Sequence, residues 1–165
     1  MGGGGIHAGG GSLAPSYAAM PPMSSPLGPS DIPTVLREAR TIAVVGCSPR
    51  GFQTSHRIAR YIQGAGYEMV PVNPNHDEIL GATCYPDLVS IPESVEIDVI
   101  DVFRRPEFVA DVVRDAADRA ERTGQKPVVW TQIGVHSDEA EALAEAAGLP
   151  YVRNRCLMVD HAALG

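Results

Sequence analysis

Short apolar runs alternate with amphipathic stretches along most of the chain. Val- and Ile-rich segments bounded by Gly, Pro or polar residues predict five buried strands, at 41–46, 67–72, 98–103, 127–131 and 150–152. Apolar residues at helical spacing between them predict helices at 31–39, 55–63, 106–122 and 138–147, and we expect an irregular segment after residue 152. This alternation predicts an α/β fold, a Rossmann-like doubly wound parallel sheet of about five strands with helices on both faces.

The first 30 residues differ in composition from the rest. They are rich in Gly, Pro, Ser and Ala and contain few large apolar side chains. Burial of so little apolar surface would not offset the entropy lost on ordering. We therefore expect a flexible tail at 1–30 and one domain at 31–165.

Net charge and cysteine content limit the classes of partner and the cellular compartment that we expect. The net charge of -7 and the pI near 5.1 argue against nucleic acid as the main partner. No uncharged apolar run is long enough to cross a membrane, and no secretory signal is evident. The three cysteines, Cys47, Cys84 and Cys156, contain no CxxC pair, so we expect neither disulfides nor a metal. A cytoplasmic protein is expected, and the sequence is compatible with a homo-oligomer.

The loop after the first strand is the main candidate site, because parallel sheets bind ligands beyond the carboxyl ends of their strands. This loop begins at Gly46 and leads into a helix, an arrangement that favours phosphate binding. The dinucleotide fingerprint GxGxxG would need glycine where Ser48 stands, and Phe52 after Gly51 excludes a Walker loop. A modified phosphate loop remains, with donors at Ser48, Arg50, Thr54, Ser55 and Arg57. Ser55 could instead serve only as a helix cap.

Other strand ends add candidate ligand contacts. Asn73 and Pro74 follow the second strand, where an NAD-binding domain would carry an acid; a simple Asn-Pro turn is the alternative. Phe103 and Arg104 follow the third strand and could contact an adenine, a pantetheine arm or a phosphate. The loop after the fourth strand contains further candidates that could bind an amide-rich ligand, Gln132 and Gly134.

A candidate nucleophile lies near the C-terminus. Cys156 is followed five residues later by His161, and a Cys/His pair can form a reactive thiolate. That spacing is not diagnostic. A buried structural cysteine is the favoured interpretation.

Five segments together resemble a known family: GCSPRGFQTSHRIARYIQGAGYEMVPVNPN, EILGATCYPDL, DVFRRPE, VVWTQIGV and NRCLMVDH. They resemble the stand-alone CoA-binding domain family, similar in fold to the N-terminal domain of the succinyl-CoA synthetase alpha subunit, over residues 34–161. The resemblance implies coenzyme A as the ligand. It also implies CoA-binding residues at the first three strand ends, namely Gly46, Cys47, Ser48, Pro49 and Arg50, then Asn73 and Pro74, then Val102, Phe103 and Arg104. The synthetase's catalytic histidine lies in a second domain that has no counterpart here, so ligase activity is not implied.

Three functions remain open at this point. The favoured one is a CoA or acyl-CoA binding module without catalysis. The second is an NAD(P)-dependent oxidoreductase, which Ser48 and Asn73 disfavour. The third is an acyl-transfer or redox protein that uses Cys156 with His161, or Cys47.

Overall fold

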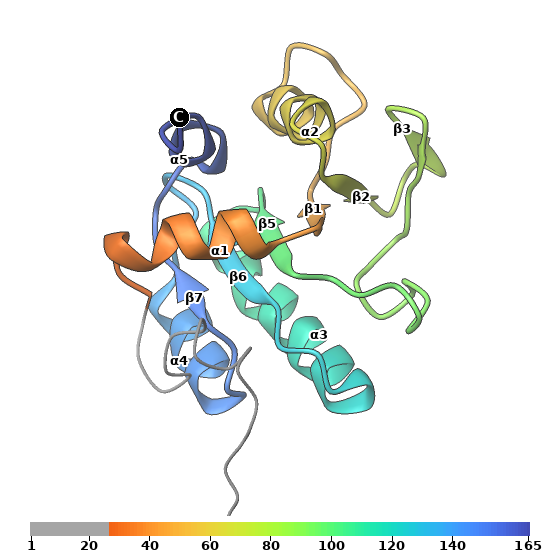
Figure 1. Cartoon of the computed structure of the whole chain (residues 1–165). Helices are drawn as coiled ribbons and strands as arrows, with labels where there is room; N and C mark the ends of the chain where they lie inside the picture. The colour runs from red at the N-terminus through yellow and green to blue at the C-terminus, as the bar shows by residue number, and fades with distance from the viewer. Residues whose placement is uncertain (1–26) are drawn as a thin grey trace, which may run out of the picture.

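The computed structural model describes residues 27–165 and contains one parallel sheet of five strands (Figure 1). Across the sheet the order is β2-β1-β5-β6-β7. The strands are β1 (Thr41–Val45), β2 (Glu68–Val72), β5 (Val99–Val102), β6 (Val128–Thr131) and β7 (Tyr151–Val152). Every residue of β1, β5 and β6 is buried, as expected for strands covered on both faces. The predicted Rossmann-like α/β fold is confirmed.

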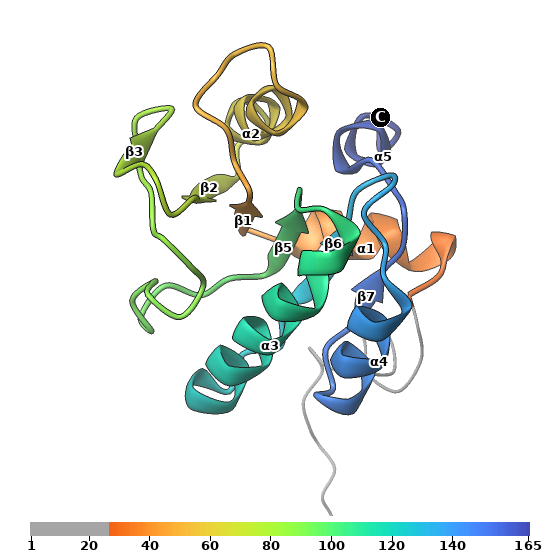
Figure 2. The same ribbon diagram turned by 180° about the vertical axis from the view of Figure 1, so that it is seen from behind.

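Helices cover both faces of the sheet (Figures 1 and 2). One face carries α1 (Ile32–Glu38), α2 (Thr54–Gly64) and α5 (Leu157–Ala162), and the other carries α3 (Pro106–Thr123) and α4 (Asp138–Ala146). Successive strand residues point to opposite faces, so Ile42 and Val44 pack with the first group, and Ala43 and Val45 with the second. Two hydrophobic clusters result, one on each side of the sheet.

Two segments differ from the sequence-based prediction. A hairpin of β3 (Glu78–Ile79) and β4 (Ala82–Thr83) precedes β5, and its turn places Leu80 and Gly81 at positive φ. Leucine seldom adopts this conformation, so the turn has no typical sequence signature. The expectation of an irregular C-terminal segment is wrong, because α5 forms there. This six-residue helix fully buries only Leu157 and therefore shows no helical periodicity.

The predicted tail lies largely outside the described residues. Of its last four residues, Leu27 is buried and its N–H donates to the carbonyl of Tyr151 at 3.3 Å. A single 3-10 turn, η2 (Pro29–Asp31), then leads into α1. Within residues 27–165, no helix has the length and apolar character needed to cross a membrane.

The long segment between β4 and β5 is anchored by Arg119 of α3. This arginine is 2 % exposed and donates to the carbonyls of Pro92 at 2.9 Å and Val95 at 2.6 Å, with further bonds to Leu88 and Ile91. Since a buried guanidinium is stable only when it is hydrogen bonded, one side chain fixes a segment that has no regular structure.

Candidate functional site

The strand order reverses between β1 and β5, and the loops that leave these strands form the candidate site. Val45 and Val102 are in register, so both loops begin at the same level of the sheet. Gly46 has φ +83, and a Cβ there would lie 2.6 Å from the carbonyl oxygen of Phe103. Only glycine permits this close approach. Gly46 therefore joins the loop after β1 to the loop after β5 at the point where such sheets bind ligands.

Internal hydrogen bonds shape the loop after β1. The N–H of Ser48 donates to Ser55 Oγ at 2.9 Å, and the N–H of Arg50 donates to Ser48 Oγ at 3.1 Å. His56 Nδ1 lies 2.9 Å from the Ser48 carbonyl oxygen. Ser55 thus organises the loop and does not cap the helix. Both serine hydroxyls act as acceptors in these bonds, which leaves their hydrogens available to donate to a ligand.

Helix α2 begins without a side-chain cap. The side chain of the N-cap residue, Gln53, accepts no hydrogen bond, and the same holds at α1, α3 and α5. Among the α-helices of residues 27–165, α4 alone has a capping side chain, Ser137, which accepts the Ala140 N–H at 3.2 Å. The first-turn N–H groups of an uncapped helix and the positive end of its dipole favour an anion. Four predicted site residues are exposed around this helix start: Pro49, Arg50, Thr54 and Arg57.

Asn73 connects the end of β2 to the same loop. Its Nδ2 donates to the carbonyl of Cys47 at 2.8 Å, and its Oδ1 accepts the Asn75 N–H at 2.9 Å. The bond from Asn75 matches the Asn-Pro turn that the sequence left open as an alternative, whereas the bond to Cys47 joins two separate loops. Asn73 positions the loop, while Pro74 lines a hollow beside it.

Two hollows flank Arg104 at this edge of the sheet. The smaller, about 150 Å³, is lined by residues that include Gly46, Pro74 and Phe108. The larger, about 510 Å³, is lined by six of the residues predicted from sequence, namely Thr54, Phe103, Arg104, Gln132, Gly134 and Cys156. The Arg104 guanidinium carbon lies 4.7 Å from the centre of the Phe108 ring. This cation–π contact holds the positive charge of Arg104 between the two hollows.

The other predicted contact residues lie in the sheet or in the wall of the larger hollow, where they support the site. Val102 is fully buried in the sheet. Gln132 Oε1 accepts the Leu157 N–H at 3.2 Å, and the Gly134 N–H donates to Asn154 Oδ1 at 3.1 Å. Gln132 and Gly134 thus fix the wall of the larger hollow.

The structure separates the proposed nucleophile from its partner. Cys156 lines the larger hollow, whereas His161 Nδ1 lies 2.9 Å from the Tyr61 hydroxyl and its ring packs against Tyr67. No polar contact in the described chain joins the side chains of Cys156 and His161. Cys47 is fully buried, and this burial together with the nearby Cys84 raises the pKa of its thiol to about 12. A thiol in that state is a poor nucleophile.

Sequence reasoning missed Asp101, in the middle of β5. The side chain is fully buried, and neither carboxylate oxygen has a hydrogen-bond partner within residues 27–165. Burial raises the pKa of this carboxyl well above its ordinary value, so the group is held protonated. The sequence does contain a signal for it, because an acidic residue interrupts the apolar run Val99–Val102.

Comparison with known proteins finds relatives over most of the chain. YneT of Bacillus subtilis is 35% identical over 133 residues, which are 81% of this chain and 93% of YneT. A solved structure described as a hypothetical protein from Pyrococcus horikoshii OT3 matches with a TM-score of 0.76 and 36% identity, covering 88% of this chain and 96% of that one. The ADP-forming acetate–CoA ligase II of Archaeoglobus fulgidus is 32% identical over 108 residues, 64% of this chain but only 15% of the ligase.

The sequence model of one family extends over nearly all of the sheet and its helices. That family is described as the CoA binding domain, and the match covers residues 40–162, from the residue before β1 to the end of α5. The chain belongs to the CoA binding domain family.

Proposed function

We propose that this protein binds CoA or an acyl-CoA at the carboxyl edge of its sheet and acts in the cytoplasm as a non-catalytic binding or regulatory module. The observation that carries the proposal is the loop after β1, which Gly46 holds against the Phe103 carbonyl and which leads into the uncapped start of α2. Main-chain N–H groups at such a helix start match the pyrophosphate of CoA. The Ser48 and Ser55 hydroxyls add donors beside them.

The surroundings of this loop support an elongated ligand. The hollow of about 510 Å³ on one side of Arg104 has the size of a small-molecule site, and the hollow of about 150 Å³ on the other side can add a smaller part of the ligand. Arg104 lies between them as a phosphate partner. The half-buried Phe103 ring and the exposed Ile133 offer apolar surface along the larger hollow.

A binding role without catalysis fits the state of the candidate nucleophiles. The Cys47 thiol is inaccessible, and His161 is paired with Tyr61 rather than with Cys156. The matched segment in the Archaeoglobus fulgidus ligase forms a small part of that enzyme, so a domain of this type can serve as a binding unit.

Calorimetric titration with CoA, dephospho-CoA, NAD and ATP tests the proposal. We expect CoA to bind most tightly. Ser48→Asp should weaken CoA binding at least about tenfold, because it adds a carboxylate where a phosphate would lie. Ser94→Asp introduces the same charge at an exposed position outside the site and should leave the affinity within about twofold of wild type. Binding of NAD without CoA would refute the proposal and support the oxidoreductase alternative, and wild-type affinity in Ser48→Asp would place the ligand elsewhere.

A further inference from the structure

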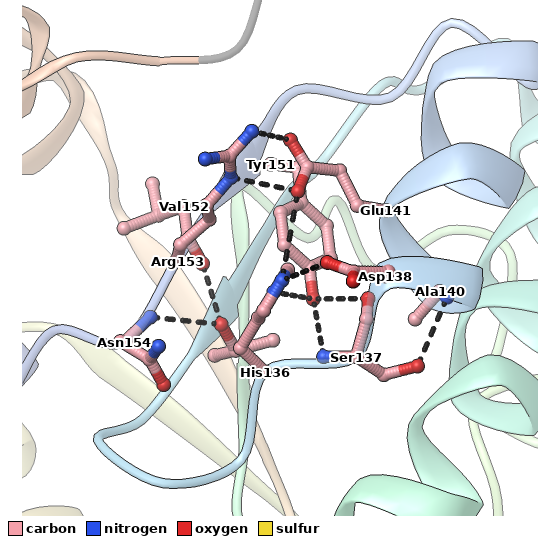
Figure 3. A network of polar contacts seen from close by, with 10 residues as sticks. His136, Ser137, Asp138, Ala140, Glu141, Tyr151, Val152, Arg153 and Asn154 are labelled. Carbon is pink, nitrogen blue, oxygen red and sulfur yellow. Dashed lines mark hydrogen bonds and ion pairs between the residues drawn. The ribbon is translucent and has the colours of Figure 1, made fainter.

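A histidine and two carboxylates meet where α4 begins, in the segment that follows Val135 of the larger hollow (Figure 3). His136 precedes the helix, Asp138 is its first residue and Glu141 lies in its first turn. His136 Nε2 is 2.8 Å from Asp138 Oδ1 and 3.8 Å from Glu141 Oε1. Three potential ligand atoms, one from each residue, lie within 4.8 Å of one another. We propose that His136, Asp138 and Glu141 bind a divalent transition-metal ion of the zinc type.

The spacing of these atoms suits such an ion. Zinc binds imidazole nitrogen and carboxylate oxygen at about 2.0–2.2 Å, which places neighbouring ligand atoms of a tetrahedral site about 3.3 Å apart. The separations of 2.8 and 3.8 Å lie on either side of that value. The distances from His136 Nε2 to the two carboxylates therefore suit a shared centre after small side-chain shifts. Asp138 is fully exposed, so the remaining coordination position is open to water.

Tyr151 holds the imidazole in a suitable orientation. Its hydroxyl lies 3.1 Å from His136 Nδ1 and 3.4 Å from the Ser137 carbonyl oxygen. When this hydroxyl donates to Ser137, it can accept from Nδ1–H. In that tautomer the Nε2 lone pair can bind a cation, which replaces the 2.8 Å contact of Nε2 with Asp138 Oδ1. Metal-binding histidines are commonly fixed by such a bond at the other ring nitrogen.

Arg153 positions Glu141 and leaves the cluster negative. Its Nε and a terminal nitrogen donate to the two oxygens of Glu141, both at 2.7 Å (Figure 3). Glu141 is only 16% exposed and therefore has little freedom to turn away from His136. The two carboxylates outweigh the one guanidinium, and their excess negative charge attracts a cation. The mixed nitrogen and oxygen ligands favour Zn²⁺ over Mg²⁺, which prefers oxygen.

Titration of the metal-free full chain with ZnCl₂, and separately with MgCl₂, tests this site by calorimetry. We expect one Zn²⁺ site and much weaker Mg²⁺ binding. His136→Gln and Asp138→Asn should each weaken Zn²⁺ binding at least about tenfold. With Co²⁺ in place of Zn²⁺, the wild-type protein should show the visible absorption of a bound ion. This absorption should be absent from His136→Gln and Asp138→Asn.

Two control variants separate this site from other ways of holding zinc. Glu139→Gln removes an exposed charge from the same helical turn, and Cys156→Ser removes the half-buried thiol; both should keep wild-type affinity within about twofold. The proposal is overturned by the absence of Zn²⁺ binding, by equal losses in Glu139→Gln and Asp138→Asn, or by loss of the site in Cys156→Ser. Because this titration contains no CoA, its result is independent of the function proposed above.

Discussion

Replacement of Gly46 by alanine tests the close approach of the two loops at the candidate site. An L-residue at φ +83 costs about 1–2 kcal/mol relative to glycine. The added Cβ would also lie 2.6 Å from a backbone oxygen, which cannot turn away as a side chain could. Relief of that collision requires a shift of the β5 end, at a cost of about 1–3 kcal/mol. The expected loss in the free energy of unfolding is therefore about 2–5 kcal/mol for Gly46→Ala.

Two matched glycines separate the contributions to that loss. Gly66 has φ +100, but an added methyl group there would meet nothing within 4 Å, so Gly66→Ala measures backbone strain without collision. Gly51 has neither feature, and Gly51→Ala should change the free energy of unfolding by less than about 0.5 kcal/mol. Urea unfolding followed by circular dichroism measures all three. If Gly46→Ala is no less stable than Gly66→Ala, the two loops do not meet closely at Gly46, and the candidate site loses its main structural support.

Two further variants test the buried polar groups, and one labelling experiment on the native protein tests the cysteines. Asp101→Asn should become more stable relative to wild type as pH rises above the ordinary carboxyl pKa of 3.8, because the folded wild type holds the Asp101 proton more tightly than the unfolded chain does. Urea unfolding of both proteins at several pH values checks this. A difference in the free energy of unfolding that does not change with pH would contradict it. Arg119→Met should lower the free energy of unfolding by about 3–5 kcal/mol, because it leaves the carbonyls of segment 88–95 without donors. A loss below about 1 kcal/mol would show that contacts other than those of Arg119 fix the segment. In the native protein at pH 8, iodoacetamide should modify Cys156 much faster than Cys47, as followed by peptide mass spectrometry, and comparable rates would mean that Cys47 is not buried.

Much of the candidate site follows from the sequence because its residues lie directly after strands. Gly46, Phe103, Arg104, Gln132 and Gly134 are predictable from their places at the ends of apolar runs. The parallel sheet brings those ends together, and the larger hollow collects several of these side chains. The same reasoning could not show that Asn73 bonds to the Cys47 carbonyl, or that the Ser48 and Ser55 hydroxyls accept bonds within their own loop. Those contacts depend on distances across the fold.

The pattern of apolar and polar residues by itself determined the parallel α/β fold, since five β-branched runs alternating with amphipathic helices can bury their apolar faces together in a doubly wound sheet. Only the tertiary structure decided which polar groups meet. It paired His161 with Tyr61, left Asp101 without a partner among residues 27–165, and brought Tyr151 beside His136. The physical reason is that hydrogen bonds and charges act over a few ångströms, whereas residues that are neighbours in space can lie far apart along the chain.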